Sequence, residues 1–253
     1  MKKELSDMYF LGRKCIFCDK YGLYRLKNNK LKCKHCKKYY SLNRLRRDLE
    51  ILYYFYLEVS ARKTAKELNL NYSVVHKKFM QFRKRIAKYC NTEAKKLNGE
   101  LEIDESYFGG KRKGNRGRGA NNKTIVFGIL ERNRTVHTVI VENVSAETLM
   151  NEIKNKTKKG SVFYTDGWKS YASLEQYGKH NVIRHDKDEF AKEKNHINGI
   201  EGFWSFAKER FHKYHGIDKK NYQFYLKEME FRFNNRNNNV YKLLMNICIR
   251  GAV

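Results

Sequence analysis

Apolar and polar positions follow two different periods along this chain, and the change between them separates two regions. Between about residues 45 and 90, apolar side chains recur every three or four positions, which predicts amphipathic helices. From about residue 100, β-rich runs predict strands at 101–107, 124–131, 135–142, 161–165 and 181–185. Further helices are predicted at 146–156, after the N-cap Ser145, and at 197–211 and 222–234.

The order of the predicted elements after residue 100 indicates the fold class. Three strands joined by short turns come first, and a helix, a strand, a helix and a strand follow. This order fits a mixed sheet covered by helices, so we expect an α/β domain. Its last helix should bury one apolar stripe, formed by Tyr222, Leu226, Met229 and Phe233.

The helical region has the pattern of a helix-turn-helix. One apolar face of the first helix is formed by Leu45, Leu49, Leu52, Tyr56 and Val59. A short helix at 62–68 turns Ala65 and Leu68 inward, and residues 69–71 form the turn. The third helix has an apolar stripe of Val75, Phe79, Phe82 and Ile86. Its other faces are basic, with Lys77, Lys78, Arg83, Lys84 and Arg85.

The third helix is the one expected to read DNA. In helix-turn-helix proteins the recognition helix enters the major groove, with its N-terminal residues at the base edges. The predicted base-contacting residues are therefore Tyr72, Ser73, His76 and Lys77. A basic three-helix packing unit that enters no groove is the alternative.

The net charge of the chain limits the classes of binding partner that are expected. The 253-residue chain has 54 Lys and Arg against 27 Asp and Glu, a formal net charge of +27. Nucleic acid or an anionic membrane surface is the usual partner of such a field. No apolar run reaches the roughly 18 residues of a membrane span, and no apolar segment typical of a secretory signal follows the first residues. We therefore expect an intracellular, reducing environment and no membrane partner.

Four of the six cysteines form two pairs near the start of the chain, Cys15-x2-Cys18 and Cys33-x2-Cys36. Two such pairs about fifteen residues apart can close a tetrahedral site of four thiolates around Zn²⁺. The segments 21–26 and 30–32 can form a hairpin between them, which predicts a zinc ribbon. Four thiolates leave no open position for chemistry, so the expected role is structural. Two unrelated thiol pairs, or a redox site, are the alternatives.

Two aspartates occupy positions where a buried carboxylate is costly. On the first strand, Asp104 points to the face opposite the apolar Leu101 and Ile103. The apolar strand at 161–165 is followed directly by Asp166. A carboxylate at the end of a buried strand costs free energy unless it is paired or binds a cation. Two in one sheet, in a protein expected to meet a polyanion, favour a cation site.

The predicted helix at 197–211 adds a third carboxylate. Its packing stripe is formed by Ile200, Trp204, Ala207 and Phe211. A different arc, roughly 80° wide, carries Asn198, Glu201, Ser205 and Lys208. Asp104, Asp166 and Glu201 together supply the oxygen ligands that a pair of Mg²⁺ (or Mn²⁺) ions requires. Taken singly, each carboxylate would be interpreted as a surface charge or a helix cap.

Several segments carry a family resemblance. The sequences IDESYFGG at 103–110, TDGWKSY at 165–171 and HINGIEGFWS at 196–205 resemble motifs of the ISXO2-like (IS1595) insertion-sequence transposases of bacteria. FYLKEMEFRFNNR at 224–236 is similar to the family's terminal helix. The order of zinc ribbon, helix-turn-helix and Asp-Asp-Glu sheet looks like that of the DDE transposases, and the eukaryotic Merlin transposons share this ancestry. The resemblance covers about residues 12–237.

The resemblance implies a catalytic domain with the ribonuclease H-like fold. In it Asp104, Asp166 and Glu201 would hold two Mg²⁺ ions, and Lys208 would lie near the transferred strand. Parts of the family are described with an asparagine at the third position, and Asn198 lies one turn before Glu201. We favour Glu201, because a carboxylate binds Mg²⁺ better than an amide, and assign Asn198 an accessory role.

The resemblance also implies a reaction and its partners. The expected reaction is metal-dependent cleavage at the ends of a DNA element, which frees a 3′-OH, followed by in-line attack of that 3′-OH on target DNA. The partners are double-stranded DNA, as terminal inverted repeats and target, and further copies of the chain in a homo-oligomeric DNA complex. The location would be DNA-associated, in a bacterial nucleoid or a nucleus according to the host.

The chain divides into four expected parts: a zinc ribbon at 1–44, a helix-turn-helix region at 45–98, the catalytic domain at 99–238 and a C-terminal tail at 239–253. The first two would read the terminal repeat. A Gly-rich segment at 109–119 is interpreted as a loop that orders on DNA through its basic side chains, Lys111, Arg112, Lys113, Arg116 and Arg118.

Two other functions fit parts of this pattern. A catalytically inactive, domesticated protein would keep the ribbon and the helix-turn-helix as a DNA-binding regulator. A structure-selective nuclease of the same fold would cleave without strand transfer. The presence of all three acidic residues and of Lys208 argues against the first, and joint products carrying element ends would exclude the second.

Overall fold

The structure is a computed structural model that describes residues 14–109, 123–132, 135–166, 169–183, 197–214 and 216–250. The chain divides into two compact units. The first comprises Met1–Thr92 and Arg236–Val253, and the second comprises Glu93–Asn235. No helix among the described residues is both long and apolar enough to cross a membrane.

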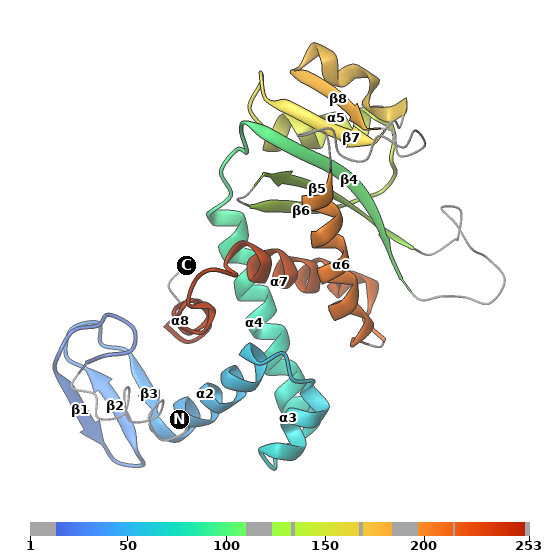
Figure 1. The fold of residues 1–253 in the computed structure, drawn as a ribbon. Helices are drawn as coiled ribbons and strands as arrows, with labels where there is room; N and C mark the ends of the chain where they lie inside the picture. The colour runs from blue at the N-terminus through green and yellow to red at the C-terminus, as the bar shows by residue number, and fades with distance from the viewer. Residues whose placement is uncertain are drawn as a thin grey trace. The chain divides into compact units, whose positions relative to one another are not determined.

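The first unit begins with a small antiparallel sheet in the order β1-β2-β3 (Figure 1). Its strands are β1 (Leu23–Leu26), β2 (Lys30–Cys33) and β3 (Tyr39–Ser41). The predicted hairpin is therefore confirmed, and β3 adds a third strand that the sequence pattern did not indicate. This sheet and the cysteine-bearing turns beside it form the ribbon, residues 14–41.

Three helices follow the ribbon: α2 (Leu42–Tyr56), α3 (Ala61–Glu67) and α4 (Tyr72–Thr92). Side-chain oxygens cap the first two, because Ser41 accepts from the Arg44 N–H at 3.4 Å and Ser60 from the Lys63 N–H at 3.3 Å. Before α4, the Asn71 side chain accepts from the Ser73 N–H at 2.8 Å. Capping by Ser41 begins α2 three residues before the apolar pattern does.

The predicted apolar stripes of these helices form their core. Phe55 of α2 makes edge-on ring contacts with Phe79 and Phe82 of α4, at centroid distances of 5.0 and 5.5 Å. One prediction on α4 was wrong, since Arg83 is only 3% exposed rather than on a basic outer face. Its guanidinium lies over the Phe55 ring at 5.4 Å, where the aromatic face offsets part of the cost of burying the charge.

The segment after residue 235 forms structure within the first unit. It contains α8 (Val240–Met245) and one π-helical turn (Asn246–Arg250). Tyr241 of α8 makes ring contacts with Tyr53 and Tyr56 of α2 at 6.2 and 5.4 Å. The helices α2 and α4 therefore pack against residues that lie about 160 to 190 positions away in the sequence.

The second unit is built on a five-stranded sheet in the order β6-β5-β4-β7-β8. Its strands are β4 (Glu100–Phe108), β5 (Thr124–Glu131), β6 (Val136–Val141), β7 (Val162–Asp166) and β8 (Lys179–Ile183). The strands β4, β5 and β6 are antiparallel neighbours, whereas β7 runs parallel to β4 and β8 parallel to β7. This mixed α/β sheet confirms the ribonuclease H-like fold class.

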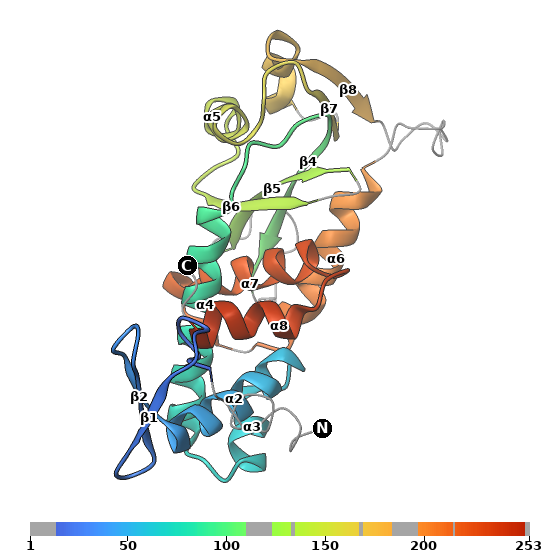
Figure 2. The same ribbon diagram turned by 90° about the vertical axis from the view of Figure 1, so that its left-hand side faces the viewer.

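Helices cover both faces of this sheet (Figures 1 and 2). One face packs against α5 (Ala146–Lys156) and the short helix η1 (Lys169–Gln176), around buried residues of β4 such as Leu101 and Ile103. The other packs against α6 (Asn198–His212) and α7 (Tyr222–Asn234), the latter preceded by the single turn η2 (Lys219–Asn221). The side chains of β4 thus alternate between two cores.

The helix α7 is buried more completely than its sequence pattern predicted. Leu226 and Met229 are buried as expected, but so is Glu230. The Glu230 carboxylate accepts hydrogen bonds from the Thr138 N–H at 2.8 Å and from the Lys227 ammonium at 2.7 Å. These partners fasten α7 to β6 and satisfy the charge that an apolar stripe alone would not explain.

Candidate active site and metal centre

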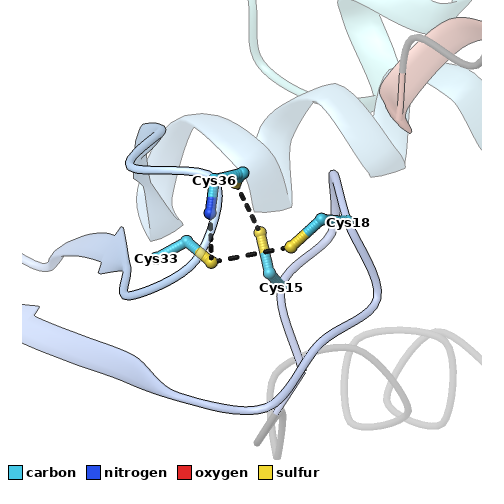
Figure 3. A group of neighbouring side chains, drawn as sticks. All are labelled: Cys15, Cys18, Cys33 and Cys36. Atoms are coloured by element: carbon cyan, nitrogen blue, oxygen red, sulfur yellow. Dashed lines mark hydrogen bonds between the residues drawn. The ribbon is translucent and has the colours of Figure 1, made fainter.

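The four predicted cysteines meet at one point of the ribbon (Figure 3). All four Sγ atoms lie within 4.8 Å of one another. The closest pairs join the two sequence motifs, with 3.7 Å between Cys15 and Cys36 and 3.6 Å between Cys18 and Cys33. Among the described residues, this is the one group of acidic, histidine or cysteine ligands compact enough to hold a single ion.

The two cysteine turns repeat the same backbone geometry eighteen residues apart. The Cys15 N–H donates to the Lys20 carbonyl at 2.9 Å, and the Cys33 N–H donates to the Lys38 carbonyl at 3.0 Å. Each turn has one residue in the left-handed region, with φ of 57° at Asp19 and 59° at Lys37. Each also aims an amide at its first sulfur, from Phe17 at 3.4 Å and from His35 at 3.3 Å.

This donor set fits a zinc ion. Burial opposes the Cys33 thiolate, but the N–H groups of Cys36 and His35 lower the pKa of that thiol to about 6. Thiolates stabilised by backbone amides are the ligands that Zn²⁺ takes in closed four-coordinate sites. With all four positions supplied by protein, the centre can support the ribbon but has no position for a substrate.

Two of the predicted carboxylates lie at matching positions of neighbouring parallel strands. The pairing of β4 with β7 places Glu102 opposite Tyr164. Two residues farther along each strand come Asp104 and Asp166, on the face that α6 covers. The strand edge at which β7 ends therefore brings these two aspartates next to each other.

The third predicted carboxylate comes from α6. Its charge and that of Asp166 both reach Asp104, whose pKa rises to about 6, chiefly through burial and then through these two neighbours. All members of the second predicted arc of α6 are exposed, namely Asn198, Glu201, Ser205 and Lys208, so this arc is separate from the packing stripe as predicted. The predicted stripe holds as well, with Phe203 as an additional fully buried member.

The three carboxylates do not form a closed group like that of the cysteines. Two divalent ions in one site lie about 3.5–4 Å apart, so their ligands surround a larger volume than those of a single zinc ion. An arrangement in which the charges of Asp166 and Glu201 add to the effect of burial on the pKa of Asp104 is compatible with such a pair. The donors are all oxygen, which suits Mg²⁺ or Mn²⁺.

Glu102 lies on the same face of β4 as Asp104, but protein groups donate hydrogen bonds to both of its carboxylate oxygens. Only 1% of its surface is exposed, and the Arg132 guanidinium donates to it at 3.0 Å. The backbone N–H of Ile200 donates to its other oxygen at 2.9 Å. Glu102 therefore caps the first turn of α6, which has no side-chain N-cap of its own, and fixes that helix on the sheet.

Two residues beside Asp104 were missed by sequence reasoning. The Trp204 indole N–H donates to the Asp104 carboxylate at 3.0 Å. Gly128 lies directly across from Asp104 on β5, and a Cβ atom there would come within 2.6 Å of the Trp204 ring. The one available signal was a glycine inside an apolar strand, which often marks a close approach.

A fourth carboxyl was also missed. The pKa of Glu105 rises to about 7, mainly through burial and then through the charge of Asp104, while an interaction with Tyr171 lowers it. The Tyr171 hydroxyl is buried, and no partner meets normal hydrogen-bond geometry with it. By strand alternation, Glu105 belongs to the face opposite Asp104, the face of Tyr171 and η1.

The predicted base-contacting residues lie in the first turns of α4. Tyr72 is 51% exposed, and its ring lies 5.5 Å from the His76 ring. Ser73 and Lys77 are exposed, and His76 is half-buried. The five basic residues predicted for the Gly-rich loop, Lys111, Arg112, Lys113, Arg116 and Arg118, lie outside the described residues.

The fold and the acidic side chains that it brings toward one another are those expected of the class of DDE transposases. The chain belongs to the ISXO2-like transposase family, whose domain matches residues 96–234. This match covers the five-stranded sheet with α5, α6 and α7.

Two curated proteins are similar to the chain. An uncharacterized transposase-like protein of Haemophilus influenzae is 45% identical over 101 residues, which are 40% of this chain and 81% of that protein. An uncharacterized protein in transposable element ISH50 of Halobacterium salinarum is 25% identical over 243 positions, covering 84% of this chain and 81% of that protein. Among solved structures, a pre-cleavage Mos1 transpososome aligns over 79% of this chain and 78% of its own, with 11% identity and a TM-score of 0.27.

Proposed function

We propose that this protein is an active DNA transposase that cleaves at the ends of its element and joins those ends to target DNA. The observation that carries the proposal is the coupling of Asp104 to Asp166 and Glu201, in a chain of a transposase family. A structural carboxylate such as Glu102 is neutralised by protein donors, whereas burial and the neighbouring charges of Asp166 and Glu201 raise the cost of ionising Asp104.

Each residue of the candidate active site has its own proposed role in the reaction. Asp104, Asp166 and Glu201 would hold two Mg²⁺ or Mn²⁺ ions, which when bound activate the attacking oxygen and stabilise the leaving oxygen of a phosphodiester. Trp204 keeps the Asp104 carboxylate in one orientation through its hydrogen bond. Lys208, exposed two turns beyond Glu201 and one turn beyond Ser205 on the same arc, would contact a phosphate of the transferred strand.

DNA recognition is assigned to the first unit. The first turns of α4 would present Tyr72, Ser73, His76 and Lys77 to base edges of the terminal repeat, in the geometry of a recognition helix. Zinc at Cys15, Cys18, Cys33 and Cys36 would hold the ribbon folded beside it. The excess of 54 Lys and Arg over 27 Asp and Glu supplies non-specific attraction to element ends and target. Two or more copies would assemble on paired ends.

The test is a reaction on supercoiled DNA that carries a pair of element ends. With Mg²⁺ we expect nicked or linear products and joint molecules in which the ends are covalently attached to target. Asp104→Asn, Asp166→Asn and Glu201→Gln should each remove both products while end binding remains. Binding without any cleavage by the native chain would indicate a regulator instead, and cleavage without joint molecules would indicate a nuclease.

The third ligand has its own test. We expect Glu201→Gln to lose cleavage and Asn198→Ala to keep much of it, because the carboxylate supplies the charge that holds the cation. Both positions are exposed on α6, so neither variant should disturb folding. The reverse pattern would assign the third ligand to Asn198, and full activity of both variants would contradict the two-metal assignment.

A further inference from the structure

The ribbon exposes three tyrosine rings, and two of them lie in one row that neither the zinc centre nor the helix-turn-helix uses. Tyr24 on β1 is 54% exposed and Tyr39 on β3 is 59% exposed. Both pair with the same residue of the middle strand, since Tyr24 lies opposite Lys32 and Lys32 lies opposite Tyr39. Residues directly opposite one another in a sheet share a face. The row Tyr24–Lys32–Tyr39, here called the tyrosine platform, therefore lies on one exposed face of the sheet.

Charge around the platform selects a negative partner. The 28 positions from Lys20 to Arg47 contain eleven Lys and Arg and no Asp or Glu. Within the platform, the Lys32 ammonium lies 5.0 Å from the centre of the Tyr39 ring. Exposed rings interleaved with cations suit a ligand that combines flat aromatic groups with negative charge, as a nucleic-acid strand does.

We propose that the tyrosine platform binds an unpaired DNA strand by stacking its bases on Tyr24 and Tyr39. A tyrosine face can stack on a base only when that base has left the duplex, because paired bases already cover one another. The two outer strands are about 10 Å apart, from a spacing of about 4.8 Å per strand, so the rings would take bases on either side of a phosphate held by Lys32. This role is separate from sequence reading by α4, which requires a duplex.

The edge of the platform continues into a basic groove of the same unit. The groove has a volume of about 870 Å³ and is lined by Tyr39 and Lys30 of the ribbon, Arg44 of α2 and Lys84 of α4, among others. One acidic residue lines it, Asp48, and the Lys78 ammonium pairs with that carboxylate at 2.9 Å. A strand that stacks on Tyr39 thus has a positively charged path onward from β3.

The experiment measures binding by the full chain without added Mg²⁺ or Mn²⁺, so its outcome does not depend on the proposed cleavage activity. Fluorescence anisotropy would compare a labelled oligothymidylate strand with a duplex of mixed sequence. The joint variant Tyr24→Leu/Tyr39→Leu should weaken single-strand binding about 100-fold, or about tenfold for each ring, and duplex binding less than threefold. Tyr24→Phe/Tyr39→Phe keeps both rings and should bind the single strand as the native chain does.

Tyr21→Leu is the matched control, because Tyr21 is 60% exposed on the same ribbon but lies outside the platform row. It should leave both affinities unchanged, and unchanged zinc content would show that each variant ribbon is folded. Native-like single-strand binding by the double Leu variant would overturn the proposal. An equal loss of duplex binding by the double Leu variant would also overturn it, because the tyrosines would then contact duplex DNA. A loss of single-strand binding by the double Phe variant would overturn it as well, because the hydroxyl groups rather than the rings would then make the contacts. Preferential displacement of the strand by RNA of the same sequence would overturn the assignment to DNA.

Discussion

The ribbon and the five-stranded sheet differ in what their candidate metal ligands contribute: the cysteines would stabilise the fold of the ribbon, and the carboxylates of the sheet would serve catalysis. In the ribbon, residues 14–41, only Cys15, Ile16 and Cys33 are buried, so two of the three buried side chains are candidate zinc ligands themselves. The sheet, in contrast, has an apolar core on each face, and its three candidate ligands contribute nothing to either core. A ribbon this small cannot bury enough apolar surface to fold without a metal, whereas the sheet can tolerate carboxylates that repel one another.

A candidate structural centre and a candidate catalytic one differ in how their ligands are arranged and charged. Structural ligands converge in the protein alone, with backbone amides already donating to the sulfurs. The candidate catalytic ligands form no closed group, and burial together with two neighbouring carboxylates raises the pKa of Asp104, because the cations that would neutralise these charges would come from outside. This comparison predicts that removing the metal ions unfolds the ribbon, whereas the sheet stays folded and loses only its activity.

Removing zinc should have the largest effect. Structural zinc sites of this type bind with roughly 10–16 kcal/mol, and that energy is folding energy for the ribbon. Chelation, or Cys15→Ser, should therefore unfold residues 14–41 and leave the sheet folded. Hydrogen exchange should show fast exchange confined to the ribbon, with zinc content falling from one ion per chain to none. Full protection of ribbon amides in zinc-free protein would contradict this contrast.

Neutralising the carboxylates should have the next largest effect, on activity alone. Each of Asp104→Asn, Asp166→Asn and Glu201→Gln should lower cleavage by at least about 10³-fold, because charge that holds the cations is lost while shape is kept. A double variant should be no worse than a single one, since the ligands act as a unit. Lys208→Ala should be milder, about 10–100-fold, as a phosphate contact. Single-turnover cleavage rates would measure all of these, and additive losses would argue for independent roles.

Changing the first turns of α4 should have a smaller and different effect. Lys77→Ala and His76→Ala should cost about 1–3 kcal/mol on the native end sequence and relax the preference among altered ends. Lys88→Ala, an exposed cation later on the same helix, is the matched control and should weaken all sequences alike. Competition binding against a panel of altered ends would separate the two outcomes. Equal weakening by all three variants would mean that α4 contacts only phosphates.

The smallest expected effect is on stability against pH. Because Glu105 has a pKa of about 7 in the fold and an ordinary value near 4.5 when unfolded, the folded state holds the proton more tightly. Its contribution to stability is therefore greatest at low pH and is lost as pH rises from about 4.5 to about 7. Glu105→Gln should gain about 1–2 kcal/mol over the native chain at pH 8 and nothing at pH 4. Thermal unfolding of the chelator-treated protein at both pH values, followed by a signal from the second unit, would measure this gain. A gain that is equal at both pH values would indicate a packing effect instead.

Much of the fold was accessible from sequence because its elements have strong local signals. The β-rich runs located all five strands, and the capping serine at 145 marks a helix start that the structure confirms. The cysteine spacing predicted the one closed ligand group. Strand alternation selected Asp104 and helical geometry selected Glu201, while the order of elements and the family resemblance grouped them with Asp166; their role as ligands stays a prediction.

The remainder depended on tertiary contacts that no local pattern records. Arg83 lies inside a basic sequence run, and only the positions of Phe55 and Phe79 make its burial tolerable. Glu102 and Asp104 look alike in the sequence, yet one meets Arg132 and a helix terminus and the other meets two carboxylates. Their difference lies in partners that are 30 to 100 positions away.

Because Gly128 on β5 has no side chain, substitution at this position should inactivate the candidate active site. A methyl group there would collide with the indole of Trp204 and displace the donor that orients Asp104. In a screen for lost transposition, Gly128→Ala would therefore be recovered as an inactive allele with every acidic residue intact. A second-site change to a smaller ring, Trp204→Phe, would relieve the collision without restoring the hydrogen bond, so it would rescue folding more fully than movement of the element.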